Sequence, residues 1–185
     1  MAYQKAAFFD RDGTLIKEVS YLSSIDDMQL LPEAVAFARL CAAWGYKIFI
    51  VTNQSGVARG YFSSEFVEAT HVVLAQQLLK EGVVVDKFYY CPHHPTEAVI
   101  QSLMVECSCR KPGPGMLHTA ATEFNLDLSQ SLMFGDRASD VQAGIAAGCR
   151  SFDIAHVMSN PLLWETIVSG HVIAGKKNCS EHVEY

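Results

Sequence analysis

Two aspartates stand directly after an apolar run near the start of the chain, and they constrain the fold more than any other feature. The stretch reads Phe8-Phe9-Asp10-Arg11-Asp12-Gly13-Thr14-Leu15. If residues 6–9 form a buried strand, Asp10 and Asp12 project from its C-terminal end, where open α/β sheets bind ligands. Two carboxylates at short range repel each other. We therefore expect other parts of the chain to bring a cation, a proton or both to this pair.

The rest of the chain alternates between apolar runs typical of buried strands and longer stretches typical of helices. We expect strands over residues 5–9, 46–51, 87–90, 131–134 and 150–154. Between and after them we expect helices over residues 32–44, from 63 or 64 to 82, and over 114–125, 139–148 and 161–168. This alternation predicts an α/β fold, a Rossmann-like parallel sheet with helices on both faces. With 185 residues and no long insertion, the chain should form a single domain over 1–185, without a cap domain.

Composition narrows the classes of partner. The formal net charge is −6 and no basic run is present, which argues against nucleic acid or an anionic membrane as the partner. Neither a signal peptide nor an apolar stretch of membrane-spanning length is found. We therefore expect a cytoplasmic protein, a monomer, that acts on a small molecule.

Polar residues follow four of the expected strands. In a parallel sheet, the loops that follow the strands meet at one edge, so a single cleft would collect all of these side chains. The clusters are Asp10 with Asp12, Thr52 with Asn53, Arg110 with Lys111, and Asp136 with Asp140.

Phosphoryl transfer is the chemistry that suits this collection. Asp10 and Asp136 offer the hard oxygen ligands that Mg²⁺ prefers. Thr52 can donate a hydrogen bond to an oxyanion, and Lys111 can neutralise a phosphoryl oxygen. A carboxylate nucleophile, a metal and a lysine together fit transfer through an aspartyl phosphate. A calcium-binding loop is disfavoured because the later acidic residues of such loops are missing.

The same four segments resemble the motifs of the haloacid dehalogenase-like (HAD-like) phosphatases. The resembling residues are 10–14, 52–53, 110–112 and 135–140, within a resemblance that spans about 6 to 153. The resemblance implies that Asp10 is the nucleophile and that Asp12 is the acid and base. It also implies that Thr52 and Lys111 bind the phosphoryl group. Asp10, the Asp12 carbonyl and Asp136 would hold Mg²⁺, and Asp140 would support the site.

Longer stretches resemble one family of these enzymes, the D-glycero-D-manno-heptose 1,7-bisphosphate 7-phosphatases. They are residues 52–62, 89–95 and 107–117. The resemblance implies a sugar bisphosphate as substrate, cleaved at its 7-phosphate, with Arg110 as a second basic contact. The residues expected to bind substrate are Glu18, Tyr21, Asn53, Gln54, Ser55, Arg110 and Arg137.

Other functions stay open at this point. Ile16, Glu18, Ser20 and Arg137 depart from the heptose pattern, and other stretches resemble the histidinol-phosphate phosphatases. A histidinol-phosphate phosphatase or another small polyol phosphatase is therefore the alternative enzyme. A receiver-like signalling domain, which accepts phosphate on an aspartate and turns over slowly, is the alternative outside enzymes.

A second metal site is expected in the long loop after residue 90. Cys91, His93, Cys107 and Cys109 offer three thiolates and one imidazole, a closed tetrahedral set for structural Zn²⁺. The heptose-phosphatase resemblance includes these positions. His94 is the competing ligand, and free thiols are the alternative. The remaining cysteines, Cys41, Cys149 and Cys179, are expected to be packing residues.

Overall fold

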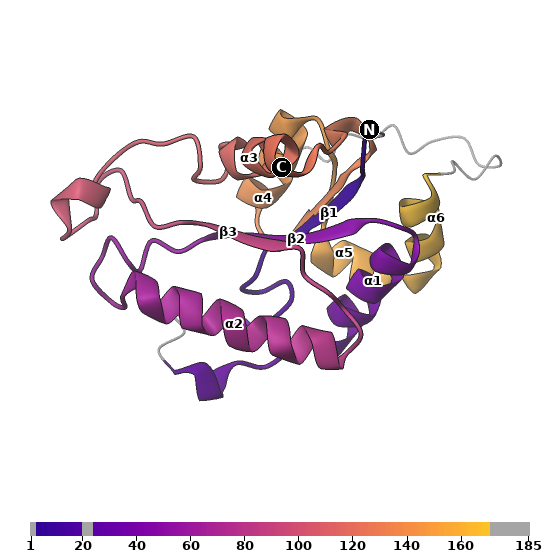
Figure 1. Cartoon of the computed structure of the whole chain (residues 1–185), viewed down its shortest axis with the longest axis horizontal. Helices are drawn as coiled ribbons and strands as arrows, with labels where there is room; N and C mark the ends of the chain where they lie inside the picture. Colours follow the sequence, from indigo (N-terminus) through magenta and orange to yellow (C-terminus); the bar gives the residue numbers. More distant parts are fainter. Residues whose placement is uncertain (1–2, 20–23, 171–185) are drawn as a thin grey trace.

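β1 (Ala6–Phe9) occupies the centre of a five-stranded sheet in which every pairing is parallel (Figure 1). The structure, a computed structural model, describes residues 3–19 and 24–170. The strand order is β3-β2-β1-β4-β5. The other strands are β2 (Lys47–Asn53), β3 (Lys87–Cys91), β4 (Leu132–Gly135) and β5 (Arg150–Asp153). The predicted parallel sheet is confirmed. The predictions for Ser20, Tyr21, Cys179 and residues 171–174 lie outside the described residues.

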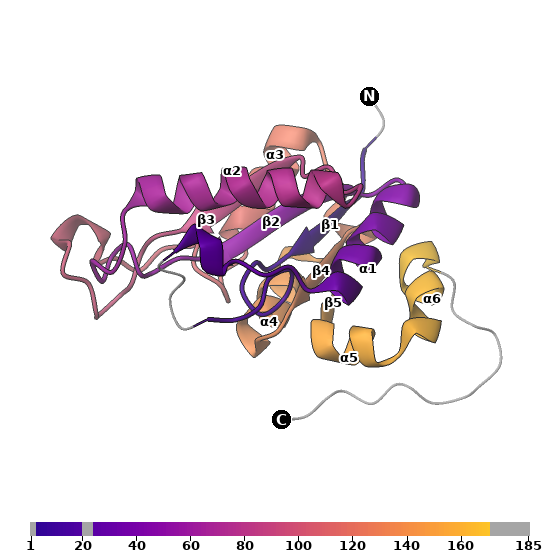
Figure 2. The same ribbon diagram turned by 90° about the horizontal axis from the view of Figure 1, so that it is seen from below.

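Helices cover both faces of the sheet, as predicted. One face carries α1 (Pro32–Ala43), α2 (Ser64–Lys80), α5 (Ile154–Ser159) and, packed against α1, α6 (Trp164–Ser169). The other face carries α3 (Gly115–Phe124) and α4 (Ala138–Ala147). Figure 2, seen from the side of α1 and α2, shows both helices lying over the strands. Short 3₁₀ turns complete the described elements: η1 (Ile25–Asp27), η2 (Gln101–Leu103), η3 (Leu128–Gln130) and η4 (Pro161–Leu163).

Alternation along β1 explains why the sheet needs cover on both faces. Successive side chains of a strand point to opposite faces. Phe9 stacks on Phe134 at 5.1 Å in the cluster under α1, whereas Phe8 stacks on Phe49 at 5.4 Å in the cluster under α3. All four rings are fully buried. The central strand is thus fixed from both sides, which gives the aspartates that follow it a rigid base.

The helix ends follow local sequence signals. Pro32 opens α1, where its fixed φ suits the first helical position. The Ser63 side chain caps α2 by accepting a hydrogen bond from the backbone N–H of Phe66 at 3.2 Å. Asn125 ends α3 and Gly148 ends α4, both in the left-handed conformation.

Three expectations about local structure were wrong. β2 continues to Asn53, because its pairing with β3 extends to Asn53 and Cys91. The first helix was expected over residues 32–44, but it ends at Ala43, and Trp44 after it is 40% exposed. The strand expected over residues 150–154 ends at Asp153, whose side chain caps the unexpected helix α5 by accepting from the backbone N–H of His156. The helix expected over residues 161–168 corresponds to η4 and α6.

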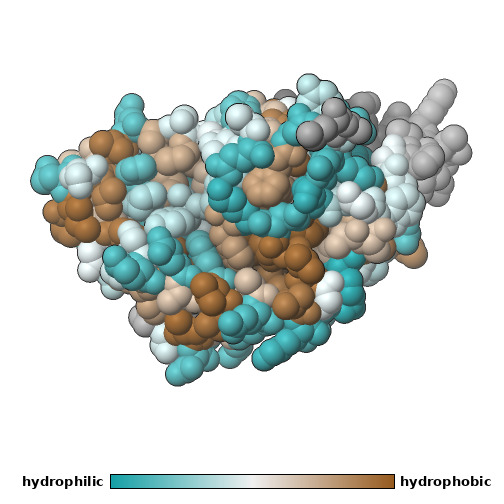
Figure 3. Space-filling model, in the orientation of Figure 1, coloured by the Kyte–Doolittle hydropathy of each residue, from teal (hydrophilic) through white to brown (hydrophobic). Residues whose placement is uncertain are grey.

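The segment between β3 and α3 projects beyond the sheet (left in Figures 1 and 2). It carries η2, and apolar side chains gather at its outer end in the orientation of Figure 3. Val99, Ile100 and Val105 are among the exposed apolar residues of this segment. Over residues 3–19 and 24–170, no helix has the length and apolar character needed to cross a membrane.

Candidate active site

A cavity of about 530 Å³ opens at the C-terminal ends of β1 and β2. Its walls come from the segments that follow these strands, the segment before α3 and the start of α4. The predicted site residues that line it are Asp10, Asp12, Glu18, Thr52, Asn53, Gln54, Ser55, Arg110, Lys111 and Arg137. Residues not singled out by the sequence also line it, namely Arg11, Val19, Gly56, Phe62, Pro112 and Ser139, together with the expected supporting residue Asp140. Most of the dispersed site residues thus meet in one cavity.

Lys111 sits at the base of the cavity between two carboxylates. Its Nζ lies 2.5 Å from Asp10 Oδ1 and 2.6 Å from Asp140 Oδ1, and it donates to the Val51 carbonyl at 2.8 Å. Lys111 is 3% exposed. Burial alone would lower the pKa of Lys111, but Asp10 and Asp140 outweigh burial and raise it. The lysine is therefore a fixed positive charge beside the expected nucleophile.

The surroundings of Asp10 act on its pKa in opposite directions. Burial raises the pKa of Asp10 to about 7, with Lys111 lowering it and Asp140 adding to the rise. A buried carboxylate with no metal bound thus retains a proton more readily than an exposed one. A divalent cation would remove this penalty by favouring the ionised form.

Asp136 shows why a cation fits here. Oxygen atoms of Asp10, Asp136 and Asp140 lie within 4.8 Å of one another. Asp136 Oδ1 is buried and has no hydrogen-bond partner among the described residues, which is costly unless another group binds it. Gly13, at φ +77°, allows the approach, since a Cβ there would lie 2.4 Å from Asp136 Oδ2. Three hard oxygen donors and an orphaned acceptor suit Mg²⁺.

Asp140 contacts the site directly. It was expected to support the site, and it also binds the backbone at the start of its helix. One carboxylate oxygen contacts Lys111, while Oδ2 accepts the backbone N–H of Arg137 at 3.0 Å at the start of α4. Gly135 makes room, since a Cβ there would fall 2.2 Å from the Asp140 Cβ.

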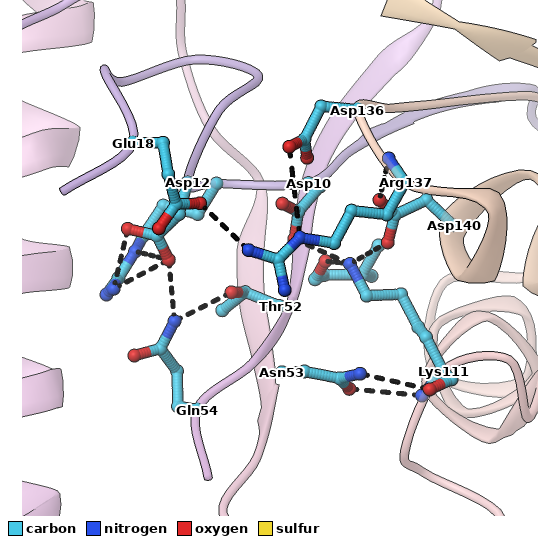
Figure 4. A network of polar contacts seen from close by, with 12 residues as sticks. Asp10, Asp12, Glu18, Thr52, Asn53, Gln54, Lys111, Asp136, Arg137 and Asp140 are labelled. Atoms are coloured by element: carbon cyan, nitrogen blue, oxygen red, sulfur yellow. Dashed lines mark hydrogen bonds and ion pairs between the residues drawn. The ribbon is translucent and has the colours of Figure 1, made fainter. Parts of the chain in front are cut away.

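Asp12 is held by donors from two loops, the one after β1 and the one after β2 (Figure 4). The Arg11 guanidinium donates through Nε to Oδ2 and through a terminal nitrogen to Oδ1, both at 3.1 Å. Gln54 Nε2 donates to Asp12 Oδ2 and to Thr52 Oγ1, each at 2.8 Å. Gln54 was predicted to bind substrate, but its amide N–H groups organise the protein's own site. Arg11 was not predicted, although its place between the two aspartates was visible in the sequence.

Asn53 is also used within the protein. Its side-chain amide donates to the Lys111 carbonyl and accepts the Lys111 backbone N–H, each at 3.0 Å. It lines the cavity as expected of a substrate contact. Its hydrogen bonds, however, tie the end of β2 to the segment that presents Lys111.

Glu18 and Arg137, both predicted substrate contacts, pair with each other at 3.1 Å at the mouth of the cavity. Arg137 also lies 3.9 Å from Asp136. Burial, followed by the charge of Asp12, raises the pKa of Glu18, although Arg137 opposes the rise. Arg110 donates to the His93 carbonyl at 3.2 Å, which connects the cavity to the projecting segment.

The predicted zinc ligands converge in that segment. The sulfur atoms of Cys91, Cys107 and Cys109 lie 3.2–3.5 Å from one another, and His93 Nδ1 lies 3.3 Å from Cys109 Sγ. One ion can bind all four atoms, which lie within 4.8 Å of one another. The competing ligand His94 lies outside this group, with Nε2 3.0 Å from an Arg59 nitrogen and Nδ1 accepting the Glu97 backbone N–H. The group therefore contains His93 rather than His94.

Comparison with known proteins agrees with this geometry. The profile of the HAD-hydrolase-like family matches residues 108–156. A D-glycero-beta-D-manno-heptose-1,7-bisphosphate 7-phosphatase of Rhodopseudomonas palustris is 42% identical over 147 residues, covering 80% of this chain and 81% of the relative. The chain belongs to the HAD-like phosphatase family, together with such heptose-bisphosphate phosphatases.

Two further members of the family extend the comparison. A D-glycero-alpha-D-manno-heptose-1,7-bisphosphate 7-phosphatase of Photorhabdus laumondii is 36% identical and covers 85% of this chain and 87% of the relative. The D,D-heptose 1,7-bisphosphate phosphatase of B. bronchiseptica, solved with magnesium and phosphate, has a TM-score of 0.70 and 32% identity. The matched region covers 80% of this chain and 79% of the B. bronchiseptica chain. This HAD-like phosphatase is thus a phosphoric monoester hydrolase with Mg²⁺ as its expected cofactor, rather than a receiver domain.

Proposed function

We propose that this enzyme removes the 7-phosphate of D-glycero-D-manno-heptose 1,7-bisphosphate through a phosphoryl group carried on Asp10. The observation that supports the chemistry most strongly is the buried grouping of Asp10, Lys111 and Asp140 beside Thr52 and Asp12. The names of the relatives support the choice of sugar.

In the first half of the reaction, the Asp10 carboxylate attacks the phosphorus and the sugar oxygen leaves. Lys111 and Thr52 bind the phosphoryl oxygens, and Asp12 gives its proton to the departing alkoxide. In the second half, Asp12 takes a proton from water as the water attacks the phosphorus. The Asp10–phosphorus bond then breaks and phosphate is released.

Bound Mg²⁺ would neutralise charge on the phosphoryl oxygens. Asp10 and Asp136 would hold it, with the Asp12 carbonyl as the further expected ligand. The described residues add Asp140 to the acidic group. The Cys91, His93, Cys107 and Cys109 group would hold Zn²⁺ as a structural ion, because four protein ligands leave no position for substrate.

The cavity also suits a small bisphosphate. Its volume of about 530 Å³ lies within the range of small-molecule sites. Arg110 and Arg137 both line it and can meet a second phosphate with paired donors. We extend the proposal to a single-domain cytoplasmic monomer. The net charge of −6 argues against a nucleic-acid or anionic-membrane partner.

The test is kcat/KM with Mg²⁺ for both anomers of the heptose bisphosphate and for histidinol phosphate. We expect one heptose anomer to be preferred, with ³¹P NMR showing loss of the 7-phosphate and retention of the 1-phosphate. Asp10→Asn should abolish turnover, while the exposed Asp27→Asn should match the wild type. A preference for histidinol phosphate would refute the substrate, and turnover by Asp10→Asn would refute the nucleophile.

A further inference from the structure

Arg11 is buried beside the acid and base of the reaction, but no step of the chemistry uses it. It is 3% exposed and lines the inner wall of the cavity. Among the residues that the structure describes, Asp12 is its only carboxylate partner within 4.0 Å. A buried guanidinium needs a paired anion and satisfied donors. The contact is therefore a fixed element of the site and not an exposed ion pair.

The two residues meet as a fork. Arg11 Nε donates to Asp12 Oδ2 and a terminal nitrogen donates to Oδ1, both at 3.1 Å, and the same terminal nitrogen also lies 2.9 Å from Oδ2. Such a bidentate pair fixes the plane of a carboxylate, which a lysine ammonium cannot do. Arg11 thus determines how the Asp12 carboxyl group is turned about its own axis.

Gln54 adds a third donor and makes the two oxygens of Asp12 unequal. Its Nε2 reaches Oδ2 at 2.8 Å, so Oδ2 accepts from both Gln54 and Arg11, whereas Arg11 is the only donor to Oδ1 among the residues that the structure describes. A carboxylate has about four lone-pair sites, two on each oxygen. Protein donors occupy both lone-pair sites of Oδ2, whereas Oδ1 retains one lone-pair site that can take a proton.

The surroundings keep Arg11 directed at Asp12. His71 of α2 is buried nearby, where its ring stacks on Phe88 with centroids 4.6 Å apart. Burial, with a smaller contribution from Arg11, lowers the pKa of His71 to about 3. A neutral imidazole carries no positive charge that would repel the guanidinium from its place beside Asp12.

We propose that Arg11 is a positioning residue that, with Gln54, holds Asp12 so that Oδ1 exchanges the catalytic proton. This inference rests on the proposed function of the site. In the first half-reaction the Oδ1–H bond breaks and the proton goes to the sugar alkoxide. In the second, a water O–H bond breaks, its proton returns to Oδ1, and the water oxygen binds phosphorus as the bond to Asp10 breaks. Gln54 also bonds Thr52, so the proton donor and a phosphoryl-binding group share one support.

The test compares Arg11→Met with Arg39→Met, which changes an exposed arginine of α1 that donates to the Glu81 carbonyl. On the heptose bisphosphate, Arg11→Met should lower kcat by about 30- to 100-fold, since a small misplacement of a catalytic group costs about that much. KM should stay within about threefold, because Arg11 binds no part of the substrate. Arg39→Met should match the wild type.

A second substrate separates positioning from a merely structural role. With p-nitrophenyl phosphate the leaving phenolate needs no proton from Asp12, whereas hydrolysis of phospho-Asp10 still needs Asp12 as base. Arg11→Met should therefore release about one nitrophenolate per enzyme in a burst, followed by slow turnover. Arg11→Lys keeps the charge without the fork and should also show the burst. Equal losses on both substrates without a burst would overturn the proposal.

Gln54→Leu gives an independent variant, in which the arginine is left in place. It should also show the burst, and its loss should not add fully to that of Arg11→Met, because both act through Asp12. Should Arg11→Met fail to fold, Gln54→Leu and Arg11→Lys decide the question. Wild-type kinetics in these folded variants would overturn the role of Arg11 alone. Failure of the wild type on the heptose bisphosphate, with p-nitrophenyl phosphate still cleaved, would overturn the substrate alone.

Discussion

We expect acid to destabilise this fold through His71, the buried imidazole of α2. Its pKa is lowered from 6.5 to about 3, chiefly because burial penalises the charged ring and secondly because Arg11 lies close. His71 Nε2 is buried without a hydrogen-bond partner, so no group in the described residues stabilises a proton there. Protonation therefore favours the unfolded chain.

The sign and size follow from linkage. Between pH 6.5 and pH 3 the unfolded chain binds a proton at His71 that the folded chain does not, so stability falls as pH falls through this window. Each unit below the unfolded pKa costs about 1.4 kcal/mol. At pH 5, one and a half units below that value, the folded state should lose about 2 kcal/mol relative to pH 8. This figure depends little on the folded pKa, provided that pKa lies well below 5.

The assay is urea unfolding at pH 8, 7, 6 and 5 for wild type and His71→Phe. The substitution keeps a ring against Phe88 and removes the titrating group. All other pH-dependent groups are shared, so the difference between the two proteins isolates His71. The wild type should lose about 2 kcal/mol more than the variant between pH 8 and pH 5, and His118→Phe, an exposed site on α3, should behave as wild type. Parallel losses in wild type and His71→Phe would refute the reasoning.

Three further predictions concern the site. Lys111→Met removes the buried cation beside Asp10 and should lower kcat by about a thousandfold or more; steady-state kinetics retaining a tenth of wild-type activity would contradict the assignment. Gly13→Ala would place a Cβ 2.4 Å from Asp136 Oδ2 and should weaken Mg²⁺ binding in calorimetry by about tenfold to a hundredfold. The matched control is Gly148→Ala, because Gly148 also has a positive φ, +88°, but an added Cβ there meets no described atom within 4 Å; an equal effect there would exclude the contact as the cause. Removing zinc with a selective chelator in excess Mg²⁺ should lower activity by about tenfold to a hundredfold, since the group holds the loop before Lys111; full activity in protein shown by metal analysis to lack zinc would disprove this.

The sheet and the edge that carries the site could be predicted because they depend on patterns along the chain. Buried parallel strands read as apolar runs, and the polar residue after each run must lie at the C-terminal edge. Thr52 was expected after the strand over residues 46–51, but it lies within β2, which continues to Asn53, so its element differs from the expectation and its edge of the sheet does not. The same logic predicts from the sequence that Asp10, Lys111 and Asp136 lie close together.

The partners of the amide side chains could not be predicted in this way. Asn53 and Gln54 carry donors and acceptors that suit a substrate as well as a protein group, and sequence does not choose between them. The choice depends on distances across the cavity, where Asn53 meets the Lys111 backbone and Gln54 meets Asp12. The Arg11 fork was missed for a related reason. Neighbours in an extended chain point to opposite faces, and only the turn after β1 lets Arg11 and Asp12 meet.

The projecting segment has a more direct link to catalysis than its distance from the sheet suggests. Cys109 precedes Arg110 and Lys111, and Asn53 holds the Lys111 backbone from the other side. Earlier in the same segment, the backbone N–H groups of Val99 and Ile100 both donate to the carbonyl of Ala58. Ala58 lies in the loop after β2 that also carries Gln54. An ion bound by Cys91, His93, Cys107 and Cys109 would therefore stiffen two walls of the cavity, the one that presents Lys111 and the one that orients Asp12. Loss of zinc should then weaken phosphoryl binding and proton transfer together, whereas loss of Arg11 should impair proton transfer alone.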